Sequence, residues 1–134
     1  MERNVCYTHF KEVVGVTHTL NLSPSPFERI QSGRKTIEMR LYDEKRSQIK
    51  VGDTLVFVHT EDSTRTLTAT VRALHRFSDF AALYAALPLE KCGYLPEEIA
   101  TASPANMDVY YSVERQAQYG VVGIEIALLK EKME

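Results

Sequence analysis

The segment from residue 26 to residue 40 reads PFERIQSGRKTIEMR and joins a short helix pattern to a strand pattern through a glycine. Phe27 and Ile30 recur at helical spacing, and Gly33 suits the left-handed backbone conformation in which helices often end. After the glycine, apolar residues alternate with polar ones as far as Leu41. The segment therefore predicts a short helix, a tight stop and a strand that starts at Lys35.

The polar side chains of this strand share one face, which carries Thr36, Glu38 and Arg40, with Lys35 just after the turn. Neighbours on one face of a strand lie roughly 6 to 7 Å apart, so Glu38 and Arg40 can pair or can contact one ligand together. Arginine is well suited to hold a phosphate or a carboxylate through two hydrogen bonds. The other interpretation is a solvated surface network of these charges, which would contribute little energy.

Lys35 is a candidate base or nucleophile only if burial or a neighbouring cation destabilises its ammonium form. Arg34 and Arg40 could supply that cation, whereas Glu38 would stabilise the charged lysine. The sequence leaves both outcomes open.

Four further strand patterns flank this segment, at residues 16–22, 54–59, 65–76 and 121–128. The second and third are joined by a polar turn and are expected to form a hairpin, while the last is β-branched and apolar with no helical period. His18 lies in phase with the leucines of the first strand, and we interpret it as a histidine at the edge of the core.

Helix starts are marked by serine and proline. Either Ser23 or Ser25 can cap the first helix, and Ser25 followed by Pro26 fits the preference best. Ser78 is the expected cap of an amphipathic helix that continues to Leu87.

The stretch between residues 89 and 119 is the least regular part of the chain. Pro96 and Pro104 each mark the start of a short helix, and Ser112 is the expected cap of a last helical turn. Five strands with short helices between them predict an α+β domain built on a small, mostly antiparallel β-barrel.

Composition narrows the class of protein. The chain has 134 residues and a formal net charge of −2, which argues against holding long duplexes by bulk electrostatics. We expect one domain over residues 16–130, preceded by an N-terminal extension over residues 1–15. No apolar run is as long as a membrane span and the N-terminus lacks a secretory layout, so we expect a cytoplasmic protein without membrane contact.

Cysteine and histidine give no sign of a metal site. Cys6 and Cys92 are expected to be unlinked thiols, and the four histidines show no metal-ligand spacing. The sequence contains no recognisable glycine-rich phosphate loop and no recognisable Ser-His-Asp order. We therefore expect neither a metal nor another cofactor.

Two groups of residues suggest nucleic acid without requiring it. Basic residues are concentrated between Arg29 and Lys50, a pattern that fits either a solvated surface or a local phosphate contact. Tyr110 and Tyr111 fit either stacking on the bases of single-stranded RNA or packing against the core.

The spacing Gly33-x-Lys35-x-x-Glu38-x-Arg40 resembles the signature of the ASCH domain, a member of the PUA-like superfamily. The resemblance extends over roughly residues 16–128, with IKVGD at 49–53 and YGVVGI at 119–124 in the matching order. It implies a PUA-like β-barrel with short flanking helices and a cleft lined by the lysine, the glutamate and the arginine. Such domains are associated with RNA binding and, in some members, with hydrolysis of nucleic acid or modified nucleosides.

One position departs from a branch of this family. Small bacterial relatives that resemble amidohydrolases of acetylated cytidine carry a threonine three residues after the lysine, where this chain has Glu38. Thr36 lies at a different distance from Lys35 and does not replace it. For a ribonuclease-like member, Ser112 or Tyr111 would be the candidates to act with Lys35.

The leading hypothesis is an RNA- or nucleotide-binding domain in which Lys35 and Arg40 contact phosphate while Glu38 orients Arg40 or accepts from a base or sugar. The alternative is a hydrolase of RNA or of an acylated nucleoside, with Lys35 as base or nucleophile and Glu38 assisting proton transfer. A third possibility is a domain whose cleft recognises a protein partner, and the oligomeric state is left open. The expected ligand-binding residues are Lys35, Thr36, Glu38, Arg40, Lys45, Arg46, Tyr110 and Tyr111.

Overall fold

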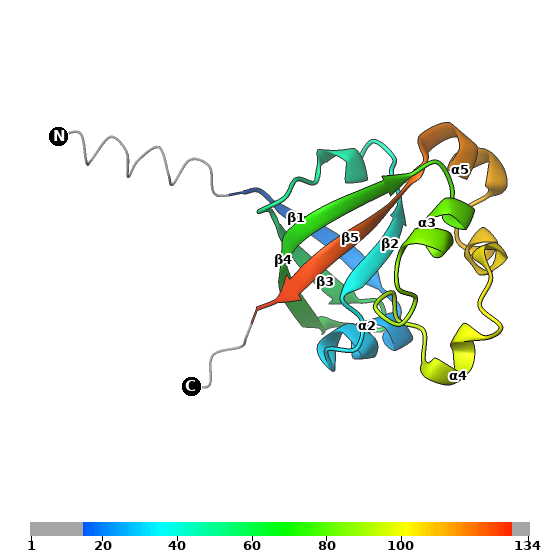
Figure 1. The fold of residues 1–134 in the computed structure, drawn as a ribbon. Helices are drawn as coiled ribbons and strands as arrows, with labels where there is room; N and C mark the ends of the chain where they lie inside the picture. Colours follow the sequence, from blue (N-terminus) through cyan, green and yellow to red (C-terminus); the bar gives the residue numbers. More distant parts are fainter. Residues whose placement is uncertain (1–14, 130–134) are drawn as a thin grey trace.

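Strands and short helices alternate along residues 15–129, the part of the chain that the computed structural model describes (Figure 1). The expected N-terminal extension lies, apart from Gly15, outside these residues, as does Cys6. In chain order the elements are β1 (Thr17–Leu22), α2 (Pro24–Gln31), β2 (Ile37–Leu41), the 3-10 helix η1 (Arg46–Gln48), β3 (Thr54–His59), β4 (Asp62–Phe77), α3 (Phe80–Ala86), α4 (Pro96–Ile99), the 3-10 helix η2 (Pro104–Val109), α5 (Val113–Tyr119) and β5 (Val121–Leu128).

The strands form one 5-stranded sheet in the order β1-β3-β4-β5-β2. The β1–β3 pair is parallel and the other pairs are antiparallel, including the predicted β3–β4 hairpin. The sheet curls into a half-barrel whose edges are β1 and β2, and Arg40 Nη2 donates to Asn21 O across the opening at 2.7 Å. The α+β class and the mostly antiparallel barrel are thus confirmed, with the barrel open along one seam.

Two helices have N-caps that differ from the predicted ones by one or two residues. The N-cap of α2 is Ser23 rather than Ser25, and the Phe27 N–H donates to Ser23 O at 3.1 Å. Pro26 is tolerated inside the first turn because the N–H groups there have no partner in the helix. The N-cap of α3 is Asp79 rather than Ser78, and its carboxylate accepts from the Ala82 N–H at 2.9 Å.

The later helix starts agree with the sequence. The first residues of α4 and η2 are Pro96 and Pro104, and the Ser112 hydroxyl accepts from the Arg115 N–H at the start of α5. Among the described residues, no helix is both long and apolar enough to span a membrane.

Hydrophobic side chains form two clusters, one on each face of β5, and the apolar side chains of β2 belong to the second. The first fills the half-barrel and packs α2 against it through Phe27 and Ile30. The second lies on the opposite face, where α3 and η2 contribute Phe80, Leu83 and Met107. Both faces of β2 are therefore covered, which places its polar side chains inside the protein rather than in solvent.

Asp53 fastens the start of β1 to the turn before β3. Its carboxylate accepts from the backbone N–H groups of Val16 at 3.0 Å and Lys50 at 2.9 Å, and it lies 2.7 Å from His18 Nε2. Burial by itself would raise the pKa of Asp53, but these hydrogen bonds lower it overall. His18 is thus a paired residue at the edge of the core, as expected.

Replacing Asp53 by alanine is expected to lower the free energy of unfolding by about 2–3 kcal/mol, because two backbone donors lose their acceptor. Asp53→Asn keeps one acceptor oxygen and is expected to lose about half as much. Urea unfolding followed by far-UV circular dichroism measures both losses. This method suits the chain because it contains no tryptophan to report unfolding by fluorescence. A loss in Asp53→Ala that does not exceed the loss in Asp53→Asn would contradict the role given to the carboxylate.

Candidate functional site

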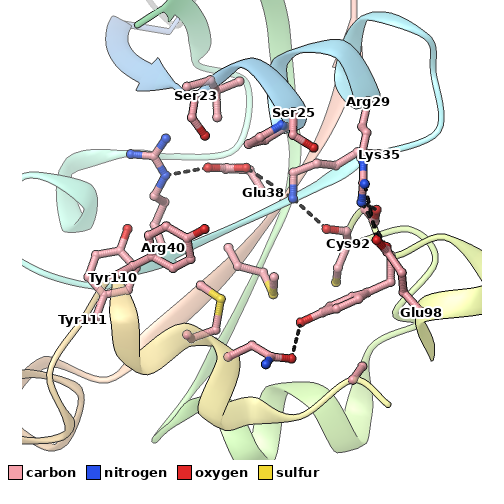
Figure 2. A pocket seen from close by; sticks show the side chains of 18 of the residues that line it. Ser23, Ser25, Arg29, Lys35, Glu38, Arg40, Cys92, Glu98, Tyr110 and Tyr111 are labelled. Carbon is pink, nitrogen blue, oxygen red and sulfur yellow. Dashed lines mark hydrogen bonds and ion pairs between the residues drawn. The ribbon is translucent and has the colours of Figure 1, made fainter. Parts of the chain in front are cut away.

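A cleft of about 710 Å³ lies between α2, β2 and the segment from residue 92 to residue 111 (Figure 2). The first wall comes from the end of β1 and from α2, the floor from β2, and the second wall from the irregular segment before α5. Its lining residues are Asn21, Leu22, Ser23, Ser25, Pro26, Arg29, Lys35, Glu38, Met39, Arg40, Cys92, Gly93, Tyr94, Glu98, Thr101, Ala102, Asn106, Met107, Tyr110 and Tyr111.

Backbone hydrogen bonds fix the turn that delivers Lys35 to the floor. Gly33 has a φ of 87° at the end of α2, and the Lys35 N–H donates to Arg29 O at 2.9 Å. The N–H groups of Thr36 and Ile37 both donate to Lys91 O, each at 2.9 Å. The start of β2 is thereby tied to both walls of the cleft.

The amine of Lys35 is surrounded by acceptors. Nζ donates to Ile37 O at 2.9 Å and to Cys92 O at 2.7 Å, and it lies 3.3 Å from Glu38 Oε1. Three acceptors match the three N–H groups of an ammonium. The structure therefore holds Lys35 as a hydrogen-bond donor to two carbonyl oxygens and as an ion-pair partner of Glu38.

Glu38 joins this lysine to Arg40. Glu38 Oε2 accepts from Arg40 Nε at 2.6 Å, and all three side chains are less than a tenth exposed. Burial by itself would raise the pKa of Glu38, but the charges of Lys35 and Arg40 lower it below its ordinary value. The network is therefore an ionised carboxylate between two cations, with a net charge of about +1.

The second wall is fitted closely around Lys35 at Gly93. This glycine has a φ of 110°, and a Cβ at this position would approach Lys35 Cδ to 3.0 Å. Arg29 Nη1 donates to Gly93 O and pairs with Glu98 Oε1 at 3.1 Å, which joins α2 to α4. Neither Gly93 nor Glu98 was predictable as a site residue, because each contacts a residue more than fifty positions away in the chain.

Aromatic and sulfur-containing side chains complete the lining. Tyr110 is 69% exposed, whereas Tyr111 is half-buried and stacks on Phe80 with ring centroids 6.0 Å apart. Burial raises the pKa of Tyr111, so its phenol keeps its proton at neutral pH. Burial likewise raises the pKa of the free Cys92 to about 11, which makes this thiol a poor nucleophile.

Five of the eight residues expected to bind ligand line the cleft, namely Lys35, Glu38, Arg40, Tyr110 and Tyr111. Thr36, Lys45 and Arg46 do not line it. Arg46 Nη1 instead lies 3.0 Å from Asp43 Oδ2 on the neighbouring connection. Within residues 15–129, no group of three or more His, Cys, Asp and Glu side chains is arranged to hold a metal ion.

A half-barrel with a buried Lys–Glu–Arg array beside its seam is the arrangement implied by the ASCH resemblance. The family model described as the ASCH domain matches residues 20–130, and the chain therefore belongs to the ASCH domain family of the PUA-like superfamily. A search of curated proteins found no significant match.

Solved structures agree with this assignment. The chain is 32% identical to the hypothetical protein PH0355, with a TM-score of 0.67 over 85% of this chain and 99% of that one. It is also 32% identical to protein PF0455 from Pyrococcus furiosus, with a TM-score of 0.60 over 86% and 99% of the two chains. ASCH from Zymomonas mobilis is 13% identical with a TM-score of 0.56, over 83% of this chain and 66% of that one, and shares the fold.

Proposed function

We propose that the cleft binds a nucleotide, either free or within a single-stranded RNA chain. The observation that carries the proposal is Arg40, a buried guanidinium that is held rigidly on one side and faces a cleft with a tyrosine rim. The ASCH family is generally associated with RNA binding, which is consistent with this assignment.

Arg40 has a donor to spare. Nε donates to Glu38 and Nη2 to Asn21 O, whereas Nη1 donates to no residue between 15 and 129. Because the pair with Glu38 fixes the plane of the guanidinium, little side-chain entropy is lost when a phosphate or carboxylate oxygen binds Nη1. Arg40 is therefore the proposed phosphate contact, and Lys35 is given a positioning role through Glu38 instead of the direct contact expected from the sequence.

The rim and the lining suit a planar base. Tyr110 offers an exposed aromatic face on which a base can stack, an interaction of about 1–3 kcal/mol. Met39 and Met107 add polarisable thioethers to the lining. The cavity volume also lies within the range of small-molecule sites.

A hydrolase acting on RNA or on an acylated nucleoside is the second candidate function. It is favoured by the buried contact between Lys35 Nζ and Glu38 Oε1, at 3.3 Å on the floor of the same cleft. Buried, coupled charges in a cleft are common at catalytic sites. Two carbonyl oxygens accept hydrogen bonds from Lys35 Nζ, which argues against Lys35 as a base or nucleophile.

Replacing Tyr110 by alanine is expected to weaken binding of a fluorescein-labelled RNA octamer about tenfold, because the stacking surface is lost. Tyr110 is an exposed residue, so the fold is expected to be unaffected. Tyr110→Phe keeps the ring and serves as the matched control, with affinity expected within about twofold of the wild type. Fluorescence anisotropy measures the octamer, and calorimetry measures the four nucleoside monophosphates.

Three results would decide the matter. Binding that survives both Tyr110→Ala and Arg40→Lys unchanged would contradict the proposed site. Release of product from the RNA octamer or from N-acylated nucleosides, abolished by Lys35→Met, would establish the hydrolase instead. Binding without turnover in the wild type supports the proposal.

A further inference from the structure

Arg40 has a counterpart on the far side of β5. The register pairs Arg40 with Val122 and Val122 with Arg76, so the three residues form one row across β2, β5 and β4. Residues directly opposite one another in a sheet project from the same face, and neighbouring strands are roughly 4.8 Å apart. The backbones of the two arginines are therefore only about 10 Å apart at the same end of the half-barrel.

Arg76 is exposed, and its guanidinium group lies over an aromatic ring. Its guanidinium carbon lies 4.0 Å from the centre of the Tyr42 ring, just beyond the end of β2. No carboxylate among residues 15–129 forms an ion pair with Arg76 or with Lys45. Their two positive charges are thus available to a ligand.

Arg46 adds a third cationic side chain near Lys45. It begins η1, in the connection that leaves the end of β2 and leads to β3 (Figure 1). Its Nη1 pairs with Asp43, but its Nε is buried and has no hydrogen-bond partner. We call Tyr42, Lys45, Arg46 and Arg76 the barrel-end patch.

We propose that the barrel-end patch binds a phosphodiester that flanks the nucleotide held in the cleft. This inference rests on the proposed function and makes its ligand a single-stranded polynucleotide rather than a free nucleotide. The backbone of the ligand leaves the cleft past Arg40 and crosses the end of the half-barrel towards Arg76. Lys45 and Arg46, which lie outside the cleft, thereby become part of the binding surface.

The test compares ligands of different length and two arginines of one strand. The probes are uridine 5′-monophosphate and single-stranded RNA octamers, and the octamers are expected to bind at least tenfold tighter because they reach the patch. Arg76→Ala is expected to weaken octamer binding about fivefold and to reduce the salt slope by about 0.7, with affinity for the monophosphate unchanged. Arg72→Ala removes the same charge elsewhere on β4 and is expected to have no effect.

The outcomes separate this inference from the proposed function. Equal affinities for the octamer and the monophosphate would overturn the patch while leaving the nucleotide cleft in place. Equal losses in Arg76→Ala and Arg72→Ala would also overturn it, because the contribution would then be general attraction. Failure of both probes to bind the wild type would overturn the proposed function and this inference together.

Discussion

Replacing Glu38 by glutamine is expected to lower the free energy of unfolding by about 3–5 kcal/mol, the usual loss when one member of a buried charge pair is removed. Lys35 and Arg40 are each less than a tenth exposed and are separated by this single carboxylate. A glutamine has nearly the same shape, so packing is preserved and the change is electrostatic. Two buried cations are left facing a neutral side chain.

The matched control is Glu28→Gln, which removes a carboxylate from a solvent-exposed pair with Arg65 at 3.2 Å. Its loss is expected to stay below about 1 kcal/mol, as is typical of surface ion pairs. Urea unfolding followed by circular dichroism measures both variants. If Glu38→Gln loses no more stability than Glu28→Gln, the buried network does not stabilise the fold in the way described.

Acidification tests the same network. The pKa of Glu38 in the folded protein lies below its ordinary value of 4.5, so the folded state binds this proton less readily than the unfolded chain. Its contribution is complete above that ordinary value and is lost as pH falls through the folded pKa. The stability difference between wild type and Glu38→Gln is therefore expected to be constant near neutrality and to shrink below about pH 4.5. A difference that grows on acidification would contradict this assignment.

Much of the strand that carries the site could be predicted, because a two-residue alternation fixes which side chains share a face. Glu38 and Arg40 do share a face and do pair, as the spacing in β2 indicated. Their burial was not predictable from β2 alone. The residues around them come from β1, from α2 and from the segment between residues 92 and 111, which has little hydrophobic periodicity and is placed by tertiary contacts.

The surroundings of Lys35 illustrate the same limit. Lys35 Nζ donates to the backbone carbonyl oxygen of Cys92, and no side-chain pattern in the sequence predicts a backbone acceptor. Because this contact is not visible in the sequence, the sequence left open whether neighbouring arginines destabilise the ammonium form of Lys35 or Glu38 stabilises it. With it, Nζ contacts two carbonyl oxygens and the Glu38 carboxylate, whereas Arg40 Nη1 donates to no residue between 15 and 129.

A buried charge network of this kind adds little net stability to a fold. Desolvating three ionised groups opposes folding, and well-packed apolar residues of similar volume often stabilise as much or more. The network is therefore better explained by what it presents to the cleft than by its contribution to stability.

The triple variant Lys35→Met, Glu38→Leu and Arg40→Met is accordingly expected to be within about 1 kcal/mol of the wild type or more stable by up to about 4 kcal/mol. Its stability should exceed that of Glu38→Gln, because no buried charge is left without a partner. Octamer binding should nevertheless fall to background, since the Nη1 donor is gone. Urea unfolding and fluorescence anisotropy on one preparation measure both quantities. A triple variant as unstable as Glu38→Gln would show that the network itself holds β2 at the seam, for example through Arg40 and Asn21 O.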